Sequence, residues 1–419
     1  MTDTALFDLC VIGFSPGGLA AAEAATALGL KVVLVATEHI ARPQEARLSA
    51  MNIRLYRGAV RFTGRDTCLA SRSEVKAKAF ILAMSRVWHP ASFPGLEQIE
   101  LLTPASAQLS CSGSTRHIVY GNTAAALEAA QRHAMTGVAV ELLVPGALLP
   151  DQDPEMTAVV CSHLRGLGVT IRFDIQVKSI SRDERGVVVR LEDSEWICGD
   201  RFLTAEQDQA FQDDIGLAVA GVDVGTTGVA VASHFQTTNP KIFAIGQAVA
   251  ASCSAPMERY QAGLVIKSLL FRLPFAGTPS SVPRIVETQP EIASVGLLEA
   301  EARQVHGNVH IYRSGFADLN PALPPGERNG FIKVVTNKRG RILGVGVVGP
   351  AAREILVPWQ VAITRRSHIL SMASLIAPPG SLHEISRRVA LQAVASNLTR
   401  KPIVFALKFL RQLGFPRYA

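Results

Sequence analysis

Two glycine-containing turns are the features of this 419-residue sequence best suited to holding a charged ligand. The first turn contains Gly13, Ser15, Gly17 and Gly18. The second contains Gly121, Thr123 and Ala126, with Glu128 close behind. In each, an apolar strand-like stretch runs through the turn into an alanine-rich helical one. Amide groups at the start of a helix attract phosphate, and glycine lets the backbone approach a diphosphate closely. Dinucleotide binding is therefore the chemistry that these turns indicate.

The elements around each turn repeat a strand–turn–helix–strand pattern. Residues 6–37 show it first, with LFDLCVIG and KVVLVAT as strands, and a second copy begins at residue 116 with RHIVYG. Such units build parallel sheets with helices on their faces. Short strands are expected at 52–86 and 169–197, and a Pro/Gly/Ser-rich linker at 274–283. The sequence therefore predicts an α/β protein with two Rossmann-like domains, followed by an α+β domain.

Composition excludes several other classes. Hydrophobic residues make up 48% and charged residues 18%, so disorder is not expected. No apolar run approaches the roughly 20 residues that span a bilayer, and the N-terminus has no leader-like pattern, so we expect a cytoplasmic protein. The net charge of +7 is not gathered into a stripe with aromatic residues, which argues against nucleic acid as a partner.

Cysteines and histidines show no metal-binding or redox spacing. The six cysteines are Cys10, Cys68, Cys111, Cys161, Cys198 and Cys253. None forms a CxxC or CxxxxC pair, and scattered cytosolic cysteines are usually core residues. His306 and His310 are four apart, but a strand is expected to begin between them. We expect no metal site.

Several longer motifs resemble the pyridine nucleotide–disulfide oxidoreductases, in the mercuric reductase and dihydrolipoamide dehydrogenase branch. These motifs are FPGL at 93–96, LLPDQDPEM at 148–156, FQTTNPKIFAIG at 235–246, TQPEIASVGLLEAEA at 288–302, and GFIKVV with GRILGVGVVGPAAREI beyond it. The resemblance covers about 6–395. It implies an FAD-type domain (1–115 and 235–272), an NAD-type domain (116–234), a dimerisation domain (281–395) forming a homodimer, and an amphipathic tail (396–419).

The same resemblance shows departures at the expected FAD site. The redox-active CxxxxC pair and several dozen residues around it are missing after Glu38. Ser15 stands at the middle glycine of the fingerprint, and Ala36 at the acidic ribose contact, with Glu38 two positions on. The family's ATG is Ala83–Ser85, and the aspartate that holds the ribityl chain is Gln247. The resemblance therefore implies FAD that is weakly held or absent.

The expected NAD and catalytic sites depart as well. Pro145 stands at the second acidic ribose contact, and Gln207 with Asp208 replace a GR motif, so NAD(P) binding is doubtful. Ala377 stands at the family's active-site histidine, while Glu384 retains the glutamate that orients it. His383 is a neighbouring substitute, but its geometry is expected to point it elsewhere.

Three hypotheses follow. The favoured one is a non-catalytic dimeric partner or scaffold, without disulfide or mercuric reductase activity. The alternative is an FAD-dependent NAD(P)H oxidoreductase that acts on a small acceptor without a redox disulfide. The third hypothesis is that residues 402–415 contact a membrane surface or a protein partner. The competing explanation for this segment is a terminal helix that packs on its own dimer.

Overall fold

The structure is a computed structural model, and it describes ten stretches of the chain. These are residues 6–37, 40–85, 93–102, 115–205, 215–225, 228–250, 253–275, 282–319, 328–378 and 380–398. The chain divides into two compact units, one formed by Met1–His89 with Asp208–Val282 and the other by Pro90–Gln207 with Pro283–Ala419. Each unit is described by itself below.

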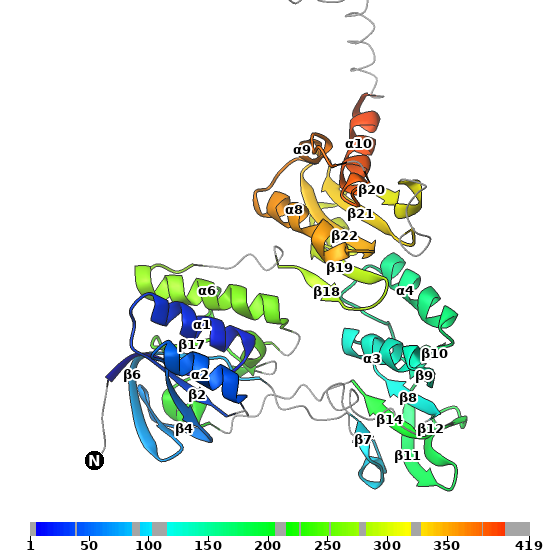
Figure 1. The fold of residues 1–419 in the computed structure, drawn as a ribbon. Coiled ribbons are helices and arrows are strands. Elements are labelled where there is room, and N and C mark those ends of the chain that lie inside the picture. The colour runs from blue at the N-terminus through cyan, green and yellow to red at the C-terminus, as the bar shows by residue number, and fades with distance from the viewer. Residues whose placement is uncertain are drawn as a thin grey trace, which may run out of the picture. The chain divides into compact units, whose positions relative to one another are not determined.

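The first unit is built on a seven-stranded sheet, with neighbours in the order β3-β2-β1-β6-β5-β4 and with β17 also paired to β6. Its elements are β1 (Leu6–Ile12), α1 (Pro16–Ala27), β2 (Val32–Ala36), α2 (Arg42–Ala50), β3 (Arg54–Arg57), β4 (Val60–Gly64), β5 (Thr67–Ala70), β6 (Ser73–Leu82), α5 (Leu217–Ala220), β15 (Val224–Gly225), β16 (Gly228–Val229), β17 (Ile242–Ala244) and α6 (Ala255–Phe271). Strand β2 is buried at every position, as expected for a parallel strand covered on both faces. Helices α1 and α6 lie side by side (Figure 1).

Helix α1 begins within the first glycine turn, at Pro16. Ser15 is its N-cap and accepts a hydrogen bond from the Gly18 amide at 3.2 Å, while Pro16 occupies the first helical position. Both residues suit a helix start, because a serine oxygen satisfies one orphan amide and proline needs no partner. The sequence predicted this helix but assigned Gly17 and Gly18 to the turn, whereas both lie in the first helical turn.

Helix α2 was not anticipated. The sequence indicated only a short link after Glu38, yet Arg42–Ala50 forms a helix between β2 and β3. Proline near its start and an ion pair from Arg47 to Glu23 of α1, at 2.8 Å, hold it in place. A nine-residue polar helix of this kind carries little apolar periodicity, which explains why the pattern did not reveal it.

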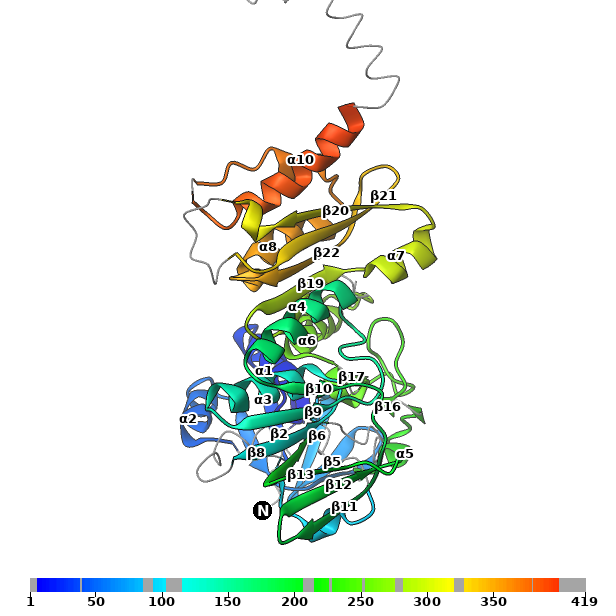
Figure 2. The same ribbon diagram turned by 90° about the vertical axis from the view of Figure 1, so that its right-hand side faces the viewer.

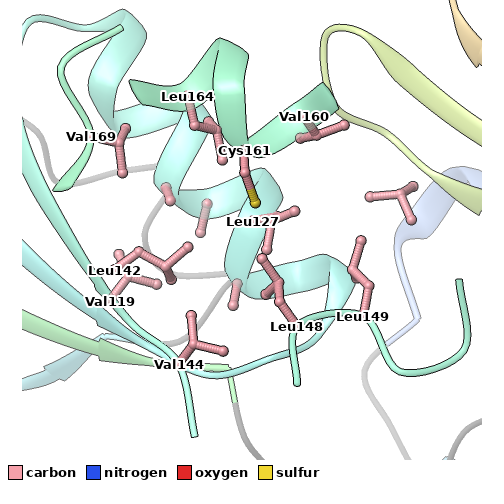
Figure 3. Packing of buried hydrophobic residues seen from close by; sticks show 14 of the residues in the cluster. Val119, Leu127, Leu142, Val144, Leu148, Leu149, Val160, Cys161, Leu164 and Val169 are labelled. Atoms are coloured by element: carbon pink, nitrogen blue, oxygen red, sulfur yellow. The ribbon is translucent and has the colours of Figure 1, made fainter. Parts of the chain in front are cut away.

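The second unit contains a five-stranded sheet in the order β10-β9-β8-β14-β7 and a three-stranded sheet in the order β11-β12-β13. Their elements are β7 (Leu101–Leu102), β8 (Arg116–Tyr120), α3 (Ala124–Met135), β9 (Ala139–Leu143), α4 (Pro154–Gly166), β10 (Thr170–Arg172), β11 (Val177–Asp183), β12 (Gly186–Leu191), β13 (Trp196–Gly199) and β14 (Arg201–Thr204). Figure 3 shows the buried core that these helices form on the larger sheet, where Leu127 of α3 and Cys161 of α4 meet Val119 of β8.

A third sheet in this unit has the order β18-β19-β22-β21-β20. Its elements are β18 (Arg284–Val286), β19 (Glu291–Gly296), α7 (Glu299–His306), β20 (Val309–Gly315), β21 (Phe331–Asn337), β22 (Ile342–Gly349), α8 (Ala352–Thr364), α9 (Leu370–Ala373) and α10 (Glu384–Leu398). Figure 2 shows α8 and α10 beside this sheet. The two helices share one buried core with it, which includes the fully buried Trp359. His306 ends α7 and His310 lies in β20, which confirms that a strand begins between them.

The mixed α/β class and the two dinucleotide-type folds are confirmed, whereas the domain boundaries stay a prediction. The structure groups Ile215 with the first unit, whereas the predicted boundaries place it in the NAD-type domain. The Phe62 amide of β4 donates a hydrogen bond to the Ile215 carbonyl at 2.8 Å. Within the described part of the chain, no helix has the length and apolar character needed to span a bilayer. The tail at 402–415 lies outside the described residues.

Candidate functional site

The first glycine turn has the backbone of a phosphate-binding turn. Gly13 follows β1 with φ +106°, and a Cβ there would lie 2.3 Å from the Ala83 carbonyl oxygen. A Cβ on Gly18 would lie 2.6 Å from the Gly13 carbonyl oxygen. Both positions therefore require glycine for close packing of strand, turn and helix. This is the role that the fingerprint assigns to them.

The amides at the start of α1 are already engaged by the protein. Pro16 has no amide hydrogen, the Gly18 amide donates to Ser15 Oγ, and the Gly17 amide donates to Glu258 Oε2 at 3.1 Å. Glu258 lies in the first turns of α6 and is only 3% exposed. The sequence reasoning missed it. Its signal was an acidic residue two positions after Pro256, in the first turn of the helix that follows KIFAIG.

Glu258 fills the space between the two segments that resemble the family's FAD contacts. A Cβ on Gly17 would lie 2.8 Å from Glu258 Cβ, and one on Gly246 would lie 2.7 Å from Glu258 Oε1. Gly246 precedes Gln247, the position of the expected ribityl contact, and Gln247 is half-buried in the same 3-10 turn. The carboxylate thus touches both the diphosphate turn and the turn after β17. With Glu258 in this position, the site does not fit a diphosphate.

The position expected for the adenosine ribose contact is apolar. Ala36 ends β2, is 1% exposed and pairs in register with Arg57 of β3. Glu38, the substitute that the sequence suggested, lies outside the described residues. Ala83 is buried, and Met84 packs on the core below the sheet. No residue of β2 therefore offers a carboxylate to the ribose.

The second glycine turn holds its helix in a similar way but uses Glu128 differently. Gly121 follows β8 with φ +146° and donates its amide to the Leu143 carbonyl at 3.0 Å. Thr123 is the N-cap of α3 and Ala126 is fully buried. The Glu128 carboxylate, however, accepts the backbone amide of Glu287 at 2.9 Å.

This contact joins the dinucleotide-type fold to the start of the third sheet. Gln131, one turn further along α3, exchanges two hydrogen bonds with the backbone of Gln289, at 2.6 and 2.8 Å. Burial raises the pKa of Glu128, and the Glu287 amide lowers it in part. In the structure these α3 side chains therefore fasten two parts of the second unit together. Gln207 and Asp208 lie outside the described residues, and Pro145 lies in the loop after β9.

The structure brings Ala377 and Glu384 together in one open hollow. Its lining also includes Asp318, Leu319, Arg387, Arg388 and Leu391. Glu384 is the first residue of α10 and accepts the Gly380 amide at 3.2 Å, so it holds the loop that carries Ala377. His383 donates its backbone amide to Ser381 Oγ. Ala377 itself has no titratable group, so a general base at that position would have to come from elsewhere.

The cysteines that the structure describes are all free, and three of the five are buried. Burial is the main cause that raises the pKa of Cys253 to about 12, and the Glu258 carboxylate adds to it. Burial also raises the pKa of Cys10, which lies against Cys68 in the core of the first unit. Such thiols are poor nucleophiles at neutral pH, because the thiolate is the reactive form. Within the described ranges, no group of three or more metal-binding side chains occurs.

A buried lysine cluster is the strongest polar feature of the second unit, and the sequence reasoning did not find it. Lys333 Nζ lies 2.7 Å from Asp153, 2.7 Å from Glu155 and 2.8 Å from Glu299. Its side chain is only 4% exposed. The Arg313 guanidinium first, and then Lys333, lower the pKa of Glu155 to about 2. The cluster connects α4, α7 and β21, and no sequence spacing links those elements.

Two glycine-turn dinucleotide folds followed by a five-stranded α+β sheet define a two-nucleotide oxidoreductase architecture. The family model for pyridine nucleotide-disulphide oxidoreductases matches residues 42–264, and the model for their dimerisation domain matches 282–388. The chain belongs to the pyridine nucleotide-disulphide oxidoreductase family.

Named relatives support the same assignment. The dihydrolipoyl dehydrogenase of Thermus scotoductus is 30% identical over 353 residues, covering 80% of this chain and 74% of that protein. The soluble pyridine nucleotide transhydrogenase of Marinobacter nauticus is 31% identical over 258 residues, covering 61% of this chain and 56% of that protein. The chain thus spans about half the length of this transhydrogenase. The HOCl-induced flavoprotein disulfide reductase RclA of Escherichia coli shares the fold, with a TM-score of 0.82 at 18% identity over 92% of this chain and 99% of that one.

These comparisons correct the favoured sequence hypothesis. A non-catalytic partner or scaffold was expected because the cysteine pair and the histidine are missing. That interpretation is wrong: the proteins that match most of the chain are named as enzymes, among them transhydrogenases and dihydrolipoyl dehydrogenases. The physical error lay in equating loss of the dithiol with loss of activity. Exchange of a hydride between nucleotides needs two bound nucleotides, and a thiolate pair is needed only for disulfide exchange.

Proposed function

We propose that this protein is an oxidoreductase that moves reducing equivalents from NAD(P)H to a small acceptor without an adjacent cysteine pair. A second pyridine nucleotide is the favoured acceptor, because the transhydrogenases of Marinobacter nauticus and Hahella chejuensis carry that substrate in their names at 31% and 30% identity. In the net reaction, one nicotinamide gives up a hydride and the other accepts it. The protein works as a homodimer through its dimerisation domain, since isologous dimers are the commonest assemblies.

The observation that carries this proposal is the pair of glycine turns, each placed between a buried strand and a helix. Gly13 and Gly121 both have positive φ and both follow the first strand of their βαβ unit. The turns preserve two nucleotide-type backbones in one chain, which is the architecture that a reaction between a flavin and a nicotinamide nucleotide requires.

FAD is the cofactor that the family implies, and we propose that this chain holds it less firmly than its relatives do. Ala36 provides no acceptor for the ribose hydroxyls, and each charge-assisted hydrogen bond lost costs about 1.5–3 kcal/mol. That range corresponds to roughly one to two orders of magnitude in affinity. Because Glu258 also occupies the diphosphate turn, the site in this structure does not fit the diphosphate of the flavin.

The test is transfer of hydride from NADPH to thio-NAD⁺, followed by the absorbance of the reduced analogue, with and without added FAD. Turnover that depends on added FAD and on protein concentration is the expected result. A second set of assays replaces thio-NAD⁺ with a quinone and with a disulfide. Activity with the disulfide alone would contradict the proposal. Absence of turnover with every acceptor at saturating FAD would refute oxidoreductase activity of this kind.

A further inference from the structure

A buried carboxylate occupies the place at the start of α1 where a dinucleotide phosphate would be held. Glu258 Oε2 accepts a hydrogen bond from the Gly17 amide at 3.1 Å. Glu258 is only 3% exposed. Helix α1 is 12 residues long, so its first amides carry a substantial share of the positive end of the helix dipole. A carboxylate and a phosphate oxygen are equivalent ligands for such a group.

Among the described residues, no cation explains the burial of this carboxylate. Among the residues that the structure describes, no lysine or arginine forms an ion pair with Glu258. Burying a charge without a partner is costly, and here the Gly17 amide, at the positive end of the α1 dipole, takes the partner's place. The arrangement is the one that a bound anion would have, with the anion supplied by the protein.

The neighbouring backbone fixes this carboxylate in place. Cβ atoms on Gly17 or Gly246 would come within 2.8 and 2.7 Å of Glu258 atoms, so glycine at both positions makes room for the side chain. Gln261, one turn further along α6, accepts the Gly246 amide at 2.7 Å and holds the turn after β17 against the helix. The fit is therefore that of a packed contact between α1, α6 and the Gly246 turn.

We propose that Glu258 is an internal competitor for the diphosphate of the incoming dinucleotide. In the resting protein its carboxylate occupies the Gly17 amide, and the cofactor binds only when that side chain leaves. The identity of the nucleotide as FAD rests on the proposed function, whereas the competition itself rests on the contact. Because displacing Glu258 weakens cofactor binding, the fraction of protein that carries the cofactor should rise and fall with the concentration of free cofactor.

Removing the charge of Glu258 while keeping the shape of its side chain tests the competitor role directly. Glu258→Gln keeps the volume of the side chain, but it removes the charge that would repel a diphosphate and weakens the hydrogen bond to Gly17. Calorimetric titration of the full-length protein with FAD, and separately with ADP, should give dissociation constants roughly 10- to 100-fold lower than for the wild type, as expected for one charge-assisted contact. Asp66→Asn removes an exposed carboxylate in the same unit, paired with Lys241, and should leave both constants unchanged.

A second variant guards against a folding defect. Glu258→Asp keeps the charge but shortens the side chain by one methylene, which withdraws the carboxylate from the Gly17 amide. It should also tighten binding, though less than the glutamine. Circular dichroism and thermal unfolding establish that each variant is folded.

The outcomes separate the two proposals. If FAD binds the wild type and Glu258→Gln equally well, the flavin assignment stands and the competitor role is refuted. If Glu258→Gln tightens ADP while no variant binds FAD, the competitor role stands and the flavin assignment fails. If neither ligand binds any variant, both proposals are refuted.

Discussion

Removing the buried Lys333 should destabilise the second unit severely. In Lys333→Met, a side chain of similar length replaces one whose ammonium contacts three carboxylates within 2.8 Å. Glu155 keeps Arg313 and Glu299 keeps Arg303, but Asp153, which is 8% exposed, loses its ion-pair partner. Breaking one side of a buried ion pair typically costs 3–5 kcal/mol, so we expect a loss of about 4 kcal/mol in unfolding free energy.

Urea unfolding followed by tryptophan fluorescence measures this loss. Trp359 is fully buried beside α10, so it reports on the third sheet once Trp88 and Trp196 are replaced by phenylalanine. Arg303→Met is the matched control, because Arg303 contacts the same Glu299 at 2.7 Å but is 53% exposed. An exposed pair of this kind contributes about 0–1 kcal/mol. Protein concentration is held constant because the stability of a dimer would depend on it.

The double variant Lys333→Met with Asp153→Asn identifies the cause. Asparagine retains the cap that Asp153 Oδ1 provides to the Glu155 amide but removes the stranded charge. We expect it to recover roughly 1–3 kcal/mol. A double variant as unstable as the single one, or a single variant no worse than Arg303→Met, would refute the reasoning.

Four further predictions concern pH, cofactor and assembly. Because its folded pKa is lowered to about 2, Glu155 contributes stability that is present above about pH 4.5 and is lost as pH falls toward 2; Glu155→Gln should flatten that part of the stability curve. Burial first, and His117 at 2.6 Å second, lower the pKa of His133 to about 4. The unfolded chain therefore takes up a proton first and stability falls between about pH 6.5 and 4. His133→Asn should reduce that decline, and the pKa of His117, which burial also lowers, accounts for the remainder. Ala36→Glu should tighten FAD binding about tenfold in a fluorescence titration, and no change would remove the ribose argument. Light scattering should give twice the 44.8 kDa chain mass at micromolar concentration, and a monomer mass would contradict a dimer through 281–395.

The sequence by itself determined the local architecture. Apolar strands that end in Gly13 and Gly121, followed by alanine-rich helices, predicted both βαβ units, because strand and helix periods and the turn residues are local properties. The specific TQPEIASVG motif likewise identified the third sheet, which begins with β18 and β19. The sequence did not reveal α2, because that polar helix has no apolar stripe.

Tertiary structure alone decided which side chains meet. Glu258 reaches Gly17 across 241 positions, Lys333 reaches Asp153 across 180, and Glu128 reaches the Glu287 amide across 159. Each contact depends on how helices cross and how strands order in a sheet, and periodicity within one segment contains no information about either. For the same reason, the residue types at 36, 247 and 377 could be compared with a family pattern, but the carboxylate that occupies the turn between them became visible only once α1 and α6 lay side by side.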